Sequence, residues 1–126
     1  MNVLVDTSVW IEFFKKNENY FFSLQGLLEN RSVLALECIF GELLQGAKNK
    51  RESEVIISYW NNLPKITIDN LLIESGKYSS EHKLISRGIG LIDCAIIVSA
   101  KQFEAKIWSF DKKLLSILKS EDIFSL

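Results

Sequence analysis

Four acidic residues lie in apolar surroundings at widely separated points of the sequence: Asp6, Glu42, Asp93 and Asp111. Asp6 and Asp111 each follow a short apolar run that ends where a turn begins. Asp93 interrupts the apolar segment 90–98, where a lone carboxylate is costly to bury unless another group compensates its charge. The chemistry that these carboxylates can perform depends on whether the fold brings them together.

Each acid also has a simpler explanation, and both explanations stay open at this point. Aspartate is favoured at the N-cap of a helix, where it stabilises the helix start by about 1 kcal/mol. Asp6, Asp93 and Asp111 all stand near the start of a helical pattern. For Glu42 the simpler explanation is an exposed carboxylate on a helix surface, although apolar neighbours flank it.

The joint interpretation predicts a metal-dependent hydrolase. The carboxyl ends of parallel strands meet at one edge of a sheet, so Asp6 and Asp111 are expected to converge there. Several carboxylates in one pocket repel one another, and a divalent cation removes that conflict. Oxygen ligands without a nearby set of His or Cys favour magnesium or manganese over zinc. The matching reaction is phosphodiester hydrolysis by an activated water.

Hydrophobic periodicity predicts strands that alternate with helices, which is typical of an α/β fold with a mainly parallel sheet. Strands are predicted at 3–5, 32–36, 66–68 and 106–109, with a short edge strand at 123–124. Helices are predicted after Asp6 and at 20–28, 37–47, 52–63, 70–85, 91–102 and 112–118. Asp69 is the expected N-cap of the helix 70–85, and a basic loop is expected at 48–51.

Composition limits the class of protein. The length of 126 residues favours one domain over residues 1–126, and the hydrophobic fraction of 48% excludes disorder. The net charge of -1 gives no footprint of a general nucleic-acid binder. No apolar stretch approaches the roughly 20 residues of a membrane span, and no basic leader precedes the first apolar run. A cytoplasmic protein is therefore expected, with Cys38 and Cys94 as buried thiols.

The four acids stand in motifs that resemble those of PIN-domain ribonucleases, in the order and spacing of the VapC toxins of type II toxin–antitoxin pairs. The motifs are Val5-Asp6-Thr7-Ser8-Val9-Trp10-Ile11, Phe40-Gly41-Glu42-Leu43-Leu44-Gln45-Gly46, Leu91-Ile92-Asp93-Cys94-Ala95-Ile96-Ile97 and Trp108-Ser109-Phe110-Asp111-Lys112-Lys113-Leu114. Each motif alone is weak, but four in order cover essentially the whole chain. Cys94 departs from the small or polar residue of many relatives. Glu37 is a rival for the catalytic Glu, and Glu42 is preferred because Gly46 follows it at the family's spacing.

The resemblance implies a three-layer α/β/α fold and a magnesium- or manganese-dependent endoribonuclease. It implies Asp6 and Asp93 as the principal metal ligands, with Glu42 and Asp111 completing the acidic pocket directly or through water. Thr7 and Ser109 would orient ligands or water as second-shell hydroxyls. The implied partners are an RNA substrate, a second copy of the chain in a homodimer, and a cognate VapB-like antitoxin.

Two other functions are consistent with parts of the pattern. A phosphoacceptor signalling domain of the flavodoxin-like type also needs an acidic magnesium pocket, and its only acceptor here would be Asp69, after the strand 66–68. A catalytically silent PIN-like binding module is disfavoured because all four acids are present. Basic residues near the acids, namely Arg87, Lys112 and Lys113, are candidates for contacts with substrate phosphate. The basic residues of the loop 48–51 are weaker candidates, and His82 is expected to be solvated.

Overall fold

A small parallel sheet forms the centre of the protein. The computed structural model describes residues 1–126. The sheet contains β1 (Asn2–Val5), β2 (Val33–Leu34) and β3 (Ala105–Trp108) in the order β2-β1-β3, and all of its pairs are parallel. The middle strand, β1, is apolar and buried from Val3 to Val5. This burial on both faces is what a parallel sheet covered by helices requires.

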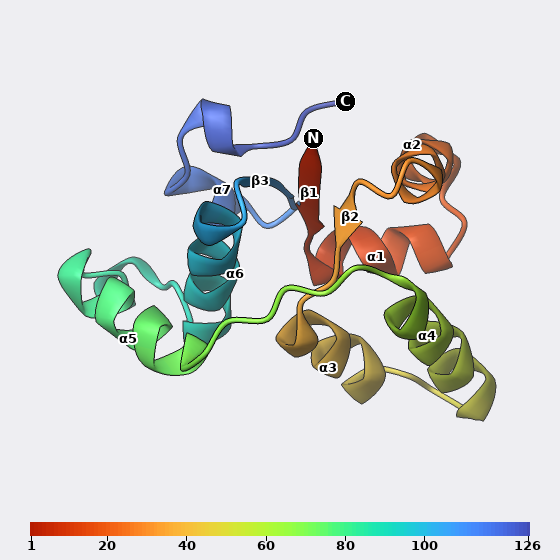
Figure 1. The fold of residues 1–126 in the computed structure, drawn as a ribbon, viewed down its shortest axis with the longest axis horizontal. Helices are drawn as coiled ribbons and strands as arrows, with labels where there is room; N and C mark the ends of the chain where they lie inside the picture. The colour runs from red at the N-terminus through yellow and green to blue at the C-terminus, as the bar shows by residue number, and fades with distance from the viewer.

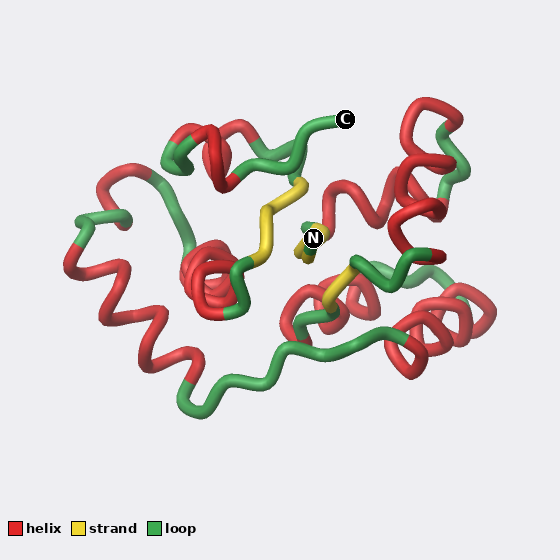
Figure 2. Tube along the Cα trace, turned by 45° about the horizontal axis from the view of Figure 1, so that its top comes forward, coloured by secondary structure: helices red, strands yellow, loops and turns green.

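Helices cover the sheet from both sides. They are α1 (Thr7–Phe14), α2 (Glu18–Glu29), α3 (Glu37–Gln45), α4 (Lys50–Asn62), α5 (Leu71–Glu81), α6 (Leu91–Gln102) and α7 (Lys112–Ser116). Figure 1 shows α1 to α4 on one side of the strands and α5 and α6 on the other. Figure 2 shows the strands lying between these two groups of helices. The predicted three-layer α/β/α fold is confirmed.

Aromatic packing holds the layer that contains α1. Trp10 is 1% exposed, and its ring lies 5.6 Å from that of Phe14 and 5.4 Å from that of Phe40 in α3. Such pairs add about 0.5–1.5 kcal/mol beyond their buried area. The opposite layer depends on α6, which is buried from Cys94 to Ala100 as its apolar sequence predicts. Both helices begin close to acids of the four motifs, so packing of the core fixes where those acids lie.

The predicted strand 66–68 does not form. The chain makes one isolated parallel bridge between Ala35 and Lys65, in which Ala35 N donates to Pro64 O and Ile66 N donates to Ala35 O. Pro64 has no N–H to donate, so pairing cannot extend toward the amino end. The segment then crosses to α5 without further ladder bonds. The predicted edge strand 123–124 is likewise reduced to one bridge, between Ile107 and Ile123.

Two helix starts also differ from prediction. Asp69 is not the cap of α5: the helix begins after Asn70, which is left-handed at φ 57°, and it ends at Glu81 rather than Ile85. The expected basic loop 48–51 is largely the first turn of α4. Asn49 accepts a hydrogen bond from Glu52 N (2.9 Å), and the Glu52 carboxylate accepts one from Lys48 N (2.7 Å). These reciprocal bonds form a cap that starts the helix earlier than expected.

None of the helices combines the length and the apolar character needed to cross a membrane.

Candidate active site

Asp6 is the most enclosed of the four acids. It follows β1 directly and opens α1, and it is 7% exposed. Its Oδ1 accepts a hydrogen bond from Thr7 N (2.8 Å), and its Oδ2 accepts bonds from Ser109 Oγ (2.6 Å) and Ser8 Oγ (3.2 Å). Three donors therefore compensate the cost of placing this carboxylate at the sheet edge. The N-cap explanation is confirmed for this residue, and its role in a site stays a prediction.

Two serine hydroxyls join the ends of β1 and β3. Ser109 Oγ accepts a hydrogen bond from Asp111 N (3.0 Å) while it donates to Asp6. Ser8 Oγ likewise accepts a hydrogen bond from Phe110 N (3.0 Å) while it donates to Asp6. Ser109 was predicted as an orienting hydroxyl, but Ser8 was missed. The signal for Ser8 was its place as the second hydroxyl residue after Asp6, since a hydroxyl can donate and accept at once.

Asp111 caps α7 and sits beside this network. Its Oδ1 accepts hydrogen bonds from Lys113 N (2.9 Å) and Leu114 N (3.4 Å). Its own N–H donates to Ser109, which itself bonds Asp6, so one hydroxyl links the backbone of Asp111 to the Asp6 carboxylate. The cap uses Oδ1, and Oδ2 is left for another ligand.

Glu42 approaches the same edge from α3. Its Oε1 accepts a hydrogen bond of 2.9 Å from Thr7 Oγ1, the residue next to Asp6. Glu42 is exposed, and it also lines a cavity of about 530 Å³ that extends between α1, α3 and α4. The rival acid, Glu37, lies at the other end of α3 and lines a different cavity, beside Trp60. This placement supports the choice of Glu42.

Asp93 lies near the other three acids. It is in the first turn of α6, whose N-cap is Gly90, so the N-cap explanation for Asp93 is wrong. Partial burial raises the pKa of its carboxyl, and the negative charges of Asp111 and Asp6 raise it further. Glu42 acts in the same direction, and a hydrogen bond from the Gly90 backbone opposes it. The four acids thus lie within electrostatic reach of one another.

The oxygen donors of this site suit a hydrated magnesium or manganese ion better than a fully protein-caged one. No group of three or more His, Cys, Asp or Glu side chains is arranged closely enough to hold a metal ion by itself. Magnesium usually keeps several waters and takes only one or two carboxylates directly. Burial first, and then the charges of Asp111 and Asp6, raise the pKa of Asp93, and a bound cation would relieve both effects. The donor chemistry of these residues therefore fits such an ion.

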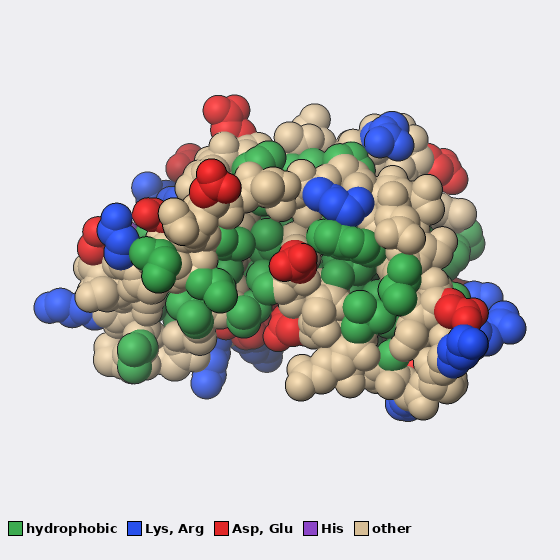
Figure 3. All heavy atoms as spheres, turned by 60° about the horizontal axis from the view of Figure 1, so that its bottom comes forward, with side chains coloured by type: hydrophobic (Ala, Val, Ile, Leu, Met, Phe, Trp, Pro, Cys, Tyr) green, Lys and Arg blue, Asp and Glu red, His purple; other side chains and the backbone are tan.

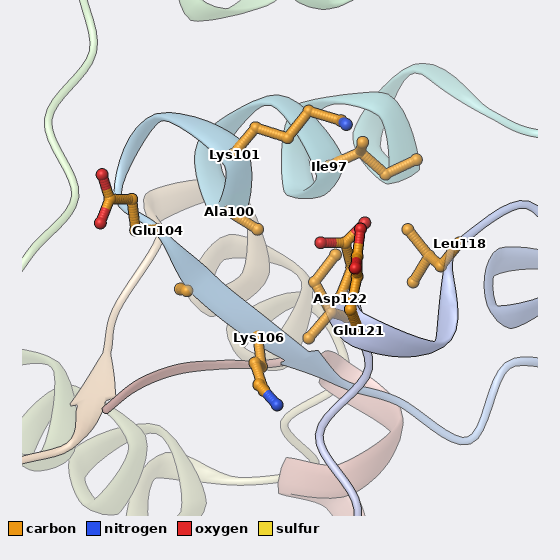
Figure 4. A pocket seen from close by; sticks show the side chains of 10 residues that line it. Ile97, Ala100, Lys101, Glu104, Lys106, Leu118, Glu121 and Asp122 are labelled. Carbon is orange, nitrogen blue, oxygen red and sulfur yellow. The ribbon is translucent and has the colours of Figure 1, made fainter.

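A second hollow lies at the amino end of β3, away from these acids. It has a volume of about 370 Å³ and lies between α6, β3 and the segment that contains Glu121 and Asp122. Figure 4 shows the carboxylates of Glu121 and Asp122 beside Leu118, while Lys106 points away from them. None of the four predicted acids lines it, so it is separate from the candidate active site.

Comparisons with known proteins agree with this architecture. The PIN domain family model matches residues 3–119. Ribonuclease VapC32 of Mycobacterium tuberculosis is 31% identical over 116 residues, which cover 89% of this chain and 86% of that protein.

Solved structures share the fold at low sequence identity. A toxin–antitoxin complex from Klebsiella pneumoniae matches with a TM-score of 0.77 at 17% identity, covering 98% of this chain and 97% of that one. VapBC2 from Rickettsia felis, bound to a DNA fragment from its promoter, matches with a TM-score of 0.73 at 19% identity, covering 98% and 96%. With the family match over most of its length, the chain belongs to the PIN domain family, among the VapC-type proteins.

Proposed function

We propose that this protein is an endoribonuclease toxin that hydrolyses RNA phosphodiester bonds with the help of magnesium or manganese, and that a VapB-like antitoxin neutralises it. The observation that carries the proposal is the gathering of carboxylates around Asp6. The charges of Asp111, Asp6 and Glu42 all act on Asp93, although these residues come from four separate parts of the chain. A curated relative of similar length is a ribonuclease, which supports the choice of substrate.

In this proposal Asp6 and Asp93 would hold the cation, and Glu42 and Asp111 would complete the pocket directly or through water. When bound, such an ion would supply positive charge for the phosphate oxygens and a water that loses its proton more readily. Ser109 fixes the orientation of the Asp6 carboxylate, and Thr7 fixes that of Glu42. Glu42 is exposed and therefore has room to take the proton of the attacking water.

The phosphoacceptor alternative loses its support. It requires an acceptor Asp at the end of a central strand, and the segment before Asp69 forms no strand. The silent binding module predicts the same fold without cleavage, so the activity measurement below distinguishes it from the nuclease.

One surface and one comparison support the proposed partners. Exposed apolar side chains lie on α5 and at the start of α6, where Leu72 is 51%, Ile73 66% and Leu91 46% exposed. Figure 3 shows hydrophobic side chains gathered on one face of the molecule, with charged groups around them. An apolar surface of this kind suits a homodimer contact. A VapB-like antitoxin is supported by the VapBC2 complex among the structural neighbours.

Cleavage of RNA by the purified protein tests the proposal. We expect cleavage with magnesium, and a loss of more than about a hundredfold in Asp6→Asn and in Asp93→Asn, because a neutral amide holds a cation poorly. Asp122→Asn, a change of the same kind beside the distant cavity, should keep full activity. Circular dichroism should show the same fold in all variants. Full activity in both Asp6→Asn and Asp93→Asn, or no cleavage by the wild type, would contradict the proposal.

A further inference from the structure

We infer that Lys113 binds a phosphate of the RNA substrate at the edge of the acidic site; this rests on the proposed function and deepens it. Lys113 is the second residue of α7, and its backbone N–H donates to Asp111 Oδ1 (2.9 Å). Its position is therefore fixed relative to one of the four acids.

The ammonium group of Lys113 lies against the loop that leads to another of the acids. A β-carbon at Gly88 would lie 3.2 Å from Lys113 Nζ and 3.7 Å from Cδ and Cε. Gly88 has a φ of +76°, a conformation that favours glycine, and it stands five residues before Asp93. The side chain of Lys113 thus extends from α7, which Asp111 caps, to the loop that precedes α6 and Asp93.

Lys113 makes no ion pair there. The ion pairs of the protein, Lys15–Glu12, Lys50–Glu54 and Lys77–Glu74, all join residues three or four positions apart in the sequence. No carboxylate oxygen comes within 4.0 Å of Lys113 Nζ. Packing against Gly88 rather than pairing with an acid leaves the donors of this ammonium free for a ligand that enters the site.

The negative charge of the site favours a nearby cationic side chain that can bind phosphate. Four ionised carboxylates with one divalent cation leave two net negative charges, which repel an incoming phosphodiester. The whole chain has a net charge of -1, so no broad positive field draws RNA in. A lysine is a compact charge with three donors, which suits a phosphate oxygen. Lys113 supplies this charge between the helix that Asp111 caps and the loop that leads to Asp93.

The test compares Lys113→Gln with Lys113→Arg and with the matched control Lys106→Gln, which removes the same charge beside the distant cavity. Steady-state cleavage of a single-stranded RNA is measured at several potassium chloride concentrations. We expect Lys113→Gln to raise KM about tenfold, as loss of one charge-assisted hydrogen bond does. Its kcat should change little, Lys113→Arg should retain most of the affinity, and Lys106→Gln should resemble the wild type.

Salt dependence separates binding of phosphate from a structural role. Loss of one phosphate contact to single-stranded RNA should reduce the slope of log(kcat/KM) against log salt by about 0.7, whereas a change in packing should not alter it. Equal KM and equal slope in Lys113→Gln and Lys106→Gln would overturn the inference while leaving the proposed nuclease intact. Absence of cleavage by the wild-type protein would reject both.

Discussion

At the scale of single residues, hydroxyl and amide donors around the Asp6 carboxylate offset the free-energy cost of burying its charge. Ser8 and Ser109 each donate to Asp6 and accept from the backbone of the segment after β3. Each serine therefore links the Asp6 carboxylate to the segment that contains Asp111. Removing either hydroxyl leaves one backbone N–H without its partner and takes one of two hydroxyl donors from Asp6 Oδ2, which costs more than the bond itself is worth.

Ser109→Ala should therefore lower both stability and activity. We expect the free energy of unfolding to fall by about 1–3 kcal/mol, because Asp6 Oδ2 and Asp111 N each lose a partner. Urea denaturation gives this value, and the cleavage rate should fall with it. Ser116→Ala is the matched control: its hydroxyl donates to Lys113 O on an exposed face, and its loss should change stability by less than about 0.5 kcal/mol. Equal losses in the two variants would contradict the role given to Ser109.

The residue types of the candidate site were predictable, but not all of their connections were. Isolated acids in apolar runs identified Asp6, Glu42, Asp93 and Asp111, and the structure brings them into electrostatic reach. Their catalytic and metal-binding roles stay predictions. The role of Ser8 depends on contact with Phe110 N, more than one hundred positions away, and no local pattern reveals such a contact. The N-cap explanation for Asp93 failed because Gly90 occupies that position.

At the scale of elements, the short helix α7 depends on the residue that also serves the site. Asp111 caps it through Lys113 N and Leu114 N. A helix of five residues has little stability of its own, so its cap and its packing against the core hold it. A substitution can therefore remove the charge of Asp111 and still keep an oxygen that caps the helix.

Asp111→Asn should keep the helix α7 but lose activity, because an amide oxygen caps a helix as well as a carboxylate does but carries no charge. We expect its free energy of unfolding to stay within about 0.5 kcal/mol of the wild type, while RNA cleavage falls strongly. Asp111→Ala should lose activity and also about 1 kcal/mol of stability. Thermal denaturation and cleavage assays measure the two effects. Wild-type activity in Asp111→Asn would remove this residue from the site.

Elements with strong periodicity were predicted well, and those that depend on tertiary pairing were not. The bounds of α6 match the prediction, since its continuous apolar sequence is decisive by itself. The segment 66–68 has β-branched residues, yet a strand needs a partner, and Pro64 and the crossing to α5 limit pairing to one bridge. The start of α5 at a left-handed Asn70 is set by that crossing rather than by local preference.

At the scale of the whole molecule, the parallel sheet is what assembles the acids. The resemblance to PIN-domain proteins implied the three-layer fold, and the alternation of strands and helices independently predicted a mainly parallel sheet. Burial of Asp93 and the charges of the neighbouring acids oppose folding, and both raise the pKa of Asp93. A cation that binds the folded protein alone must then stabilise it.

Magnesium should raise the melting temperature of the protein. At a concentration one hundred times its Kd, a ligand specific for the folded state adds about 2.7 kcal/mol to the free energy of unfolding. Differential scanning fluorimetry with magnesium and with a chelator measures the shift, and the chelator should also abolish cleavage. The shift should vanish in the double variant Asp6→Asn, Asp93→Asn, while Asp122→Asn should retain it. An equal shift in the double variant would place the cation elsewhere.

The central place of β1 has a consequence for synthesis of the protein. Asn2 and Val5 pair with Ala105 and Trp108, so β1 pairs with a strand that is synthesised about a hundred residues later. Asp93 and Asp111 are also synthesised long after Asp6. The four carboxylates therefore cannot come together before residue 111 has been made, and the proposed site forms only once β3 has taken its place beside β1.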